Sequence, residues 1–221
     1  MTQANFPAFD LNNSANWRRV DESDDGVFYQ PPRLVVHVDE HFLATLTNYY
    51  AEHLQTGMQV LDMMSSYKSH LPTSLKLGHV SAQGMNRVEL EANPQLDDFV
   101  VQDLNRNPLL PYPDNSFDAV LNTVSVQYLK RPIEVFREVG RVLKAGGQYI
   151  VSFSNRMFPT KAVAIWRENS DAGHVALVQQ YFQASAMFDA PELFQGADSK
   201  GSNWFFNAKD PVFILNGRKK E

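Results

Sequence analysis

Polar side chains that could bind a small ligand recur where short apolar runs of the sequence end. Asp62, Asp103, Asn122 and Thr123 each lie at the end of such a run. Carboxylates accept hydrogen bonds from hydroxyl and amino groups, while amide and hydroxyl side chains both donate and accept. In open α/β sheets, ligands bind outside the carboxyl ends of the strands. The spacing therefore predicts a binding crevice formed by loops 62–70, 83–87, 103–107 and 122–128, bordered by loop 155–159.

Histidine and tyrosine side chains near this crevice are candidates for acid–base catalysis. His70 ends the first loop, and His37 and Tyr29 precede the first predicted helix. A lone histidine is also common as a surface or capping residue, so the structural alternative stays open. No spacing of these residues is diagnostic of a metal site, and no metal is expected.

Four residues that follow the fourth and fifth predicted strands are candidates for substrate contact: Gln127, Tyr128, Asn155 and Arg156. An arginine at this place could hold an anionic substrate. A surface ion pair is the alternative explanation for Arg156.

Alternating strand and helix patterns supply the frame for these loops. Strands are predicted at 58–63, 77–82, 99–102, 116–123 and 148–154, with weaker candidates at 187–188 and 210–215. A helix capped by Asp39 is expected to close at Gly57, and one begins at Pro132 and stops at Gly146-Gly147. Shorter helical patterns cover 67–75, 160–169 and 174–184, and Gly196–Asn203 is expected to be a loop. The alternation predicts an α/β fold with a doubly wound, mostly parallel sheet and an antiparallel C-terminal edge.

A further helix is predicted to follow Asn86, which can cap its N-terminus. Glu89 stands three residues later, as the second member of a capping box does.

Three segments divide the chain. Residues 1–34 are polar and are expected to form an N-terminal arm, which Phe6 and Trp17 could tie to the body. Residues 35–217 are expected to form a single domain. Residues 218–221 end the chain as a basic, frayed tail.

Composition excludes several classes of function. The 221 residues are 43% hydrophobic and 20% charged, which is ordinary for one globular domain. A net charge of −5 without a basic stripe argues against a nucleic-acid partner. The absence of cysteine excludes disulfides and thiolate chemistry and is compatible with the cytoplasm, the expected location. No apolar run could span a bilayer, so no membrane partner is expected, and the sequence leaves the oligomeric state open.

One segment, 103–154, resembles the second half of a class I S-adenosylmethionine-dependent methyltransferase domain, of the type 11 kind. The resemblance rests on Leu110-Pro111-Tyr112-Pro113-Asp114-Asn115-Ser116-Phe117-Asp118 and on Arg141-Val142-Leu143-Lys144-Ala145-Gly146-Gly147. It implies a Rossmann-like, seven-stranded sheet and S-adenosylmethionine as cofactor. It also implies that Asp103 accepts a hydrogen bond from the adenine amino group and that Leu104 contacts the ring. The alternative for Asp103 is that it only caps the turn before Asn105.

The two other cofactor motifs of that family are altered here. Motif one normally has an acid followed by glycines at alternate positions, whereas Asp62-Met63-Met64-Ser65-Ser66 contains none. The resemblance places Met64 and Ser66 at the glycine positions, and the two serines could rebuild the grip on the cofactor's carboxylate. Met64 would push the backbone away unless its side chain turns inward to the sheet. A turn without any ligand is the alternative.

In motif two, Gly84 stands where the family has a ribose-binding acid, followed by Met85 against adenine and Asn86 as a small polar cap. Neutral Asn86 or Gln83 is expected to substitute in part for the missing acid. Weak or modified cofactor binding is therefore one expectation.

Three functions follow from this pattern. The first is methyl transfer from S-adenosylmethionine to a small molecule. The second is a non-catalytic protein of the same fold that binds a ligand or a partner. The third is transfer of a group other than methyl with an adenosyl cofactor.

Overall fold

The computed structural model describes residues 8–196 and 209–221 of the chain. Seven strands form one sheet in the order β3-β2-β1-β4-β5-β7-β6. The strands are β1 Gln59–Met63, β2 His79–Gly84, β3 Asp98–Val101, β4 Phe117–Thr123, β5 Leu143–Phe153, β6 Glu192–Gln195 and β7 Phe213–Arg218. Strands β3, β2, β1, β4 and β5 are parallel, and β7 pairs antiparallel with both β5 and β6. This confirms the predicted α/β, doubly wound fold with its antiparallel C-terminal edge.

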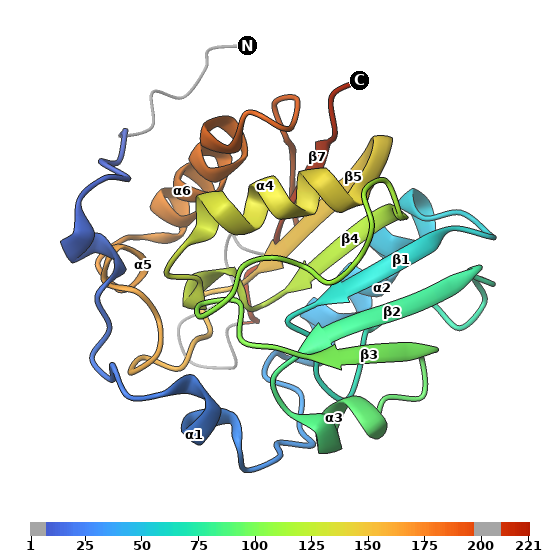
Figure 1. Cartoon of the computed structure of the whole chain (residues 1–221), viewed down its shortest axis with the longest axis horizontal. Helices are drawn as coiled ribbons and strands as arrows, with labels where there is room; N and C mark the ends of the chain where they lie inside the picture. Colours follow the sequence, from blue (N-terminus) through green and yellow to red (C-terminus); the bar gives the residue numbers. More distant parts are fainter. Residues whose placement is uncertain (1–7, 197–208) are drawn as a thin grey trace.

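Helices cover both faces of the sheet (Figure 1). The helices and 3-10 turns are η1 Ser14–Trp17, α1 Asp25–Tyr29, α2 Glu40–His53, α3 Arg87–Glu91, η2 Val126–Tyr128, α4 Pro132–Val142, α5 Ala164–Arg167 and α6 Asp171–Ser185. One apolar core contains Phe136 of α4 and Phe182 of α6, and the other contains Phe42 and Tyr50 of α2. The strand order reverses between β1 and β4, and such a reversal opens a crevice at the carboxyl ends of the strands.

Local sequence explains where the principal helices begin. The Asp39 carboxylate accepts a hydrogen bond from the Phe42 N–H at 2.8 Å, so α2 starts at its predicted cap. Pro132 occupies the first turn of α4, where its missing N–H leaves no carbonyl unpaired. The end of α2 was predicted less well, because the helix stops at His53 and Gly57 instead forms the turn into β1 with a φ of 86°.

No helix forms over the predicted segment 67–75. Pro72 cannot donate a backbone hydrogen bond, and His70 has a left-handed φ of 57°. Side chains from the following segment hold this loop instead: Asn93 donates to the Ser66 carbonyl at 2.9 Å, and Gln95 donates to the Leu71 carbonyl at 2.8 Å.

The C-terminal edge also departs from the prediction. Segment 187–188 forms one isolated bridge, between Phe188 and Lys219, because Phe188 is buried in the core; the strand lies at Glu192–Gln195. The predicted basic tail is not frayed: Arg218, the last residue of β7, pairs with Gln148 of β5, and the Lys219 N–H donates to the Gly147 carbonyl at 2.8 Å. The predicted loop Gly196–Asn203 lies largely outside the described residues.

The described part of the N-terminal arm, residues 8–34, is folded against the body. It contains η1 and α1, and the Trp17 ring lies 6.1 Å from the Tyr181 ring of α6. The other expected anchor, Phe6, lies outside the described residues. Fully buried Lys161 of the body contacts the Asp25 carboxylate of the arm at 3.1 Å, and Arg19, which also belongs to the arm, contacts the same carboxylate at 2.7 Å.

Candidate functional site

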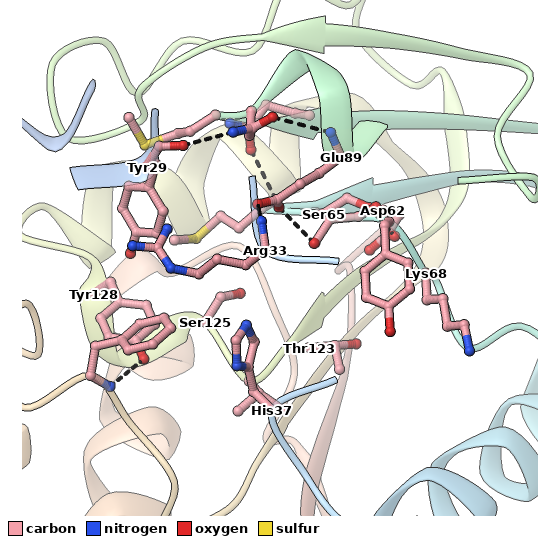
Figure 2. Close-up of a pocket in the computed structure, with 18 of the residues that line it drawn as sticks. Tyr29, Arg33, His37, Asp62, Ser65, Lys68, Glu89, Thr123, Ser125 and Tyr128 are labelled. Atoms are coloured by element: carbon pink, nitrogen blue, oxygen red, sulfur yellow. Dashed lines mark hydrogen bonds between the residues drawn. The ribbon is translucent and has the colours of Figure 1, made fainter. Parts of the chain in front are cut away.

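A cavity of about 320 Å³ opens at the carboxyl ends of the parallel strands. Its walls come from the first loop after β1, the end of β2 with α3, the loop after β3, the turn after β4 and the N-terminal arm (Figure 2). Its volume lies at the lower end of the range for small-molecule sites. The fold thus brings four of the predicted loops to one cavity.

The loop after β1 replaces a glycine turn by strained residues. Met64 has a φ of 55°, the left-handed conformation that glycine adopts without penalty. Gln83 of β2 holds it there, since its side-chain oxygen accepts the Met64 N–H at 3.0 Å and its carbonyl accepts the Ser65 N–H at 2.8 Å. The Met64 side chain packs partly against the core and its sulfur lies 3.6 Å from the Asn122 amide. The inward turn that the sequence required is therefore present.

A second strained residue faces the first across the strand-order reversal. Val124, directly after β4, has a φ of 50°, which is a genuine outlier for a β-branched residue. Both Met64 and Val124 line the cavity. Backbone strain of this kind persists only where surrounding contacts impose it, and it clusters at ligand sites.

The two serines of the loop donate their hydroxyls to carboxylates of the protein. Ser65 Oγ donates to Asp62 Oδ2 at 2.5 Å, and Ser66 Oγ donates to Glu89 Oε2 at 2.7 Å. Both hydroxyls are thus engaged as donors within the protein, and each can still accept a hydrogen bond. Burial raises the pKa of the Asp62 carboxyl to about 6, against the opposing hydrogen bonds from Ser65 and Ser69.

The end of β2 has no room for the acid that the family places there. A side chain at Gly84 would put its Cβ 2.5 Å from the Ser65 carbonyl oxygen. A nearby carboxylate on α3, that of the buried Glu89, lines the cavity and accepts the Arg33 N–H at 2.7 Å. Asn86 caps α3 by accepting the Glu89 N–H at 3.1 Å, yet the Glu89 side chain does not return to the Asn86 backbone. Of the predicted capping box, only the hydrogen bond from the Glu89 N–H to Asn86 forms, and the Glu89 carboxylate lines the cavity instead.

Asp103 and Leu104 lie in the cavity wall beyond β3. One Asp103 oxygen accepts the Asn105 N–H at 2.8 Å, as the capping alternative required. The Arg106 backbone N–H also interacts with this carboxylate, whose two oxygens together offer about four acceptor sites. Burial raises the pKa of this carboxyl. The side chain can therefore cap its turn and still accept a ligand hydrogen bond.

All three candidates for acid–base catalysis line the cavity. Figure 2 shows His37 projecting into the middle of the space. Burial lowers the pKa of His37, helped by Arg33 and opposed by Glu89, so the imidazole is neutral at pH 7. Burial and the neighbouring Lys68 lower the pKa of His70 to about 4, which makes it a weak base. Burial raises the pKa of Tyr29, which keeps its hydroxyl protonated.

The substrate candidates divide evenly. Tyr128 lines the cavity, and its hydroxyl accepts the Phe158 N–H at 2.8 Å. Arg156 also lines it, but its guanidinium is paired with Asp210 at 2.7 Å. Gln127 is fully buried beneath the turn, and Asn155 is exposed outside the cavity wall.

Three of the predicted cofactor contacts also lie outside the lining. Met63 is fully buried in the core, Gly84 lies behind Ser65, and Asn122 is fully buried and accepts the Ser125 hydroxyl at 2.7 Å. The remaining predicted contacts do line the cavity: Asp62, Met64, Ser65, Ser66, Met85, Asn86, Asp103, Leu104 and Thr123.

Several lining residues were missed from the sequence, above all Arg33, Glu89 and Phe158. The Asn86–Glu89 spacing did signal Glu89, but as a capping residue. Arg33 and Phe158 reach the cavity through tertiary contacts of the arm and the loop after β5, and no local pattern marks them. No group of three or more potential metal ligands occurs among the described residues, and no helix in that part of the chain is long and apolar enough to cross a membrane.

Comparison with known families gives one match, to a methyltransferase domain over residues 76–151. Among curated proteins, 122 residues are 26% identical to a malonyl-(acyl-carrier protein) O-methyltransferase of a Marinomonas species, covering 53% of this chain and 43% of that protein. A 66-residue stretch is 32% identical to the biotin biosynthesis bifunctional protein BioHC of Teredinibacter turnerae, covering 30% of this chain and 12% of that one. The chain thus spans less than half the length of these relatives.

Solved structures share the whole fold at low identity. The cyclase SpnF superimposes with a TM-score of 0.60 at 16% identity, over 86% of this chain and 89% of that one. The phosphoethanolamine N-methyltransferase 2 of Haemonchus contortus, solved with S-adenosyl-L-methionine, gives 0.53 at 14% identity, over 81% and 52%. A chain complexed with a methyltransferase activator in Haloferax volcanii gives 0.61 at 16% identity, over 82% and 92%.

Proposed function

We propose that this chain is a class I S-adenosylmethionine-dependent methyltransferase and that it transfers a methyl group from S-adenosylmethionine to a small molecule, which its match to a methyltransferase domain over residues 76–151 supports. The observation that carries the proposal is the set of three carboxylates around one cavity, from Asp62, Glu89 and Asp103. As acceptors, they would suit the cofactor's amino group, ribose hydroxyls and adenine amino group.

The donor set fits the cofactor from end to end. Asp103 and Leu104 would hold the adenine ring, with Met85 on its other side. Glu89 would accept the ribose hydroxyls in place of the acid absent from Gly84. Asp62 would face the ammonium of the methionine part, which favours the ionised carboxylate despite the raised pKa. When bound, the cofactor supplies an electrophilic methyl group.

On the substrate side, the residues of this chain position the acceptor and exclude water. His37, neutral at pH 7, can take a proton at a ring nitrogen from an acceptor hydroxyl or amine. Tyr29 keeps its proton and can only donate from its hydroxyl. Tyr128 and Phe158 form an aromatic wall, with ring centroids 6.0 Å apart.

Calorimetric titration with S-adenosylmethionine and S-adenosylhomocysteine tests this function. Binding of either in the micromolar range is expected, with Asp103→Ala weaker by roughly tenfold to a hundredfold because a hydrogen bond to a charged group is lost. Asp189→Ala, a change far from the cavity, is the matched control. A folded wild type that gives no heat with either ligand at millimolar concentration would refute the proposal.

A second candidate is a protein of this fold that binds a ligand without methyl transfer. The strained, glycine-free turn at Met64 and the missing acid at Gly84 favour it, and SpnF is a cyclase with the same fold. Mass spectrometry of the ligand retained on purification separates the two. Retained S-adenosylmethionine or S-adenosylhomocysteine supports methyl transfer, whereas a different adenosyl ligand would indicate different group-transfer chemistry.

A further inference from the structure

Arg33 is held rigidly at the wall of the cavity by aromatic rings. Its guanidinium carbon lies 4.6 Å from the Phe28 ring centroid, 5.4 Å from that of Phe158 and 5.9 Å from that of Tyr29. Two of its N–H groups are directed to backbone carbonyls, at 2.9 Å to Phe28 and 3.4 Å to Pro31. A guanidinium fixed over ring faces loses little freedom when it binds a ligand.

This cation has no carboxylate partner among the described residues. Glu89 accepts only the backbone N–H of Arg33, not its side chain. The two other arginines near the site are neutralised, Arg156 by Asp210 and Arg19 by Asp25, each at 2.7 Å. A guanidinium carries five N–H donors and stays ionised at any physiological pH. The Arg33 side chain therefore keeps N–H donors for a ligand. Its positive charge is unpaired in a half-buried site, which costs free energy that an anionic ligand would offset.

The surroundings of Arg33 indicate what kind of anion fits. The wall beside it is aromatic, with Tyr29, Tyr128 and Phe158 all lining the cavity. The lining also carries three carboxylates, from Asp62, Glu89 and Asp103, of which Glu89 lies beside Arg33 and accepts its backbone N–H at 2.7 Å. Arg33 and Lys68 share the lining with these three carboxylates, which would repel the second charge of a phosphate dianion, so a singly charged carboxylate fits better.

We propose that Arg33 binds a carboxylate of the acceptor molecule, so that the substrate is a carboxylic acid with an apolar or aromatic body. That the bound carboxylic acid is the methyl acceptor rests on the proposed function, whereas the anion site itself does not. Arg33 acts here as a specificity-determining residue, because a planar fork of two N–H groups matches the two carboxylate oxygens.

The test compares acids with neutral molecules of the same shape. 4-Phenylbutyrate, 4-phenylbutyramide and 4-phenylbutyl phosphate are titrated into the full chain by calorimetry, with and without saturating S-adenosylhomocysteine. The wild type is expected to bind the carboxylate at least about tenfold more tightly than the amide, and more tightly than the phosphate. Arg33→Met keeps the side-chain stem and should abolish this preference, while its affinity for S-adenosylhomocysteine stays within about twofold. Arg156→Met is the matched control and should retain the preference, since that cation is already paired.

Several results would overturn the inference: an equal affinity of the wild type for acid and amide, failure of the carboxylate to bind in the millimolar range, tighter binding of the phosphate, or loss of the preference in Arg156→Met but not in Arg33→Met. If Arg33→Met does not fold, Arg33→Lys decides, because it keeps the charge but should lose most of the preference with the fork. A wild type that prefers the carboxylate through Arg33 yet binds no adenosyl ligand would refute the proposed function alone. One that binds the adenosyl ligand without any carboxylate preference would refute this inference alone.

Discussion

Replacing Met64 by alanine and by glycine tests whether the glycine-free turn is strained. Met64 has a φ of 55°, and a left-handed conformation costs an L-residue about 1–2 kcal/mol. Glycine removes that cost but loses about 0.5–1 kcal/mol through the entropy of the unfolded chain. Both substitutions remove the same packing, so Met64→Gly should be more stable than Met64→Ala by about 0.5–1 kcal/mol. This order is the reverse of the usual one.

Met85 supplies the matched control. It is a half-buried methionine of the same cavity wall, and its φ is not positive. There Met85→Ala should exceed Met85→Gly in stability by about 0.5–1 kcal/mol. The two pairs should thus differ by roughly 1–2 kcal/mol, measured as free energies of unfolding in urea at one pH, or by a few degrees in Tm.

The result that refutes this reasoning is an alanine variant at least as stable as the glycine variant at position 64. The same four proteins, titrated with S-adenosylhomocysteine, show whether strain serves binding. If Met64→Gly binds as tightly as the wild type, the turn needs only the backbone conformation that a glycine supplies.

Three further predictions follow from buried groups around the cavity. Asp62 has a folded-state pKa of about 6, above that of the unfolded chain, so the folded protein binds a proton at this carboxyl more tightly. The free energy of unfolding of the wild type, relative to Asp62→Asn, should therefore rise by about 1 kcal/mol as the pH falls from 7 to 5, and this gain is lost as the pH rises through 6. Gly84→Asp, which restores the acid of the family, should lower the free energy of unfolding by about 1–3 kcal/mol, because its Cβ would lie 2.5 Å from the Ser65 carbonyl; tighter binding of S-adenosylhomocysteine with unchanged stability would contradict this. Lys161→Met should cost about 3 kcal/mol and speed proteolysis within the arm, since it removes the buried cation that contacts Asp21 and Asp25 of the arm; an unchanged digestion pattern would show that these ion pairs do not hold the arm.

Much of the fold could be predicted because its signals are local. A capping carboxylate at Asp39 and a first-turn proline at Pro132 act within one helical turn, and apolar runs between turn residues locate the parallel strands. Strand boundaries moved by one to five residues: β7 lies three residues beyond its predicted position, and β5 begins at Leu143, because α4 ends at Val142 and not at Gly146-Gly147 as predicted. The edge strand Glu192–Gln195 escaped prediction because exposed edge positions carry a weak pattern.

The site could be predicted only in part, for a different physical reason. Loops at the carboxyl ends of the strands were located by topology, and nine of the expected cofactor contacts do line the cavity, namely Asp62, Met64, Ser65, Ser66, Met85, Asn86, Asp103, Leu104 and Thr123. Which side chains face the ligand depends on rotations that no local pattern encodes. Asn122 and Gln127 lie in the expected turn, yet both are fully buried beneath it. Arg33 enters from an arm whose docking depends on Lys161, far away in the sequence.

The two altered motifs are one structural change rather than two losses. Without glycines, the turn after β1 leans on β2, where Gln83 accepts the N–H groups of both Met64 and Ser65. That brings the Ser65 carbonyl against Gly84, and only glycine leaves room for it. The glycine missing from the first motif therefore stands on the neighbouring strand, where it displaces the acid of the second. In the proposed function, Glu89 of α3 supplies the carboxylate that Gly84 lacks. Glu89 accepts a hydrogen bond from the Ser66 hydroxyl, which links this carboxylate to the turn after β1.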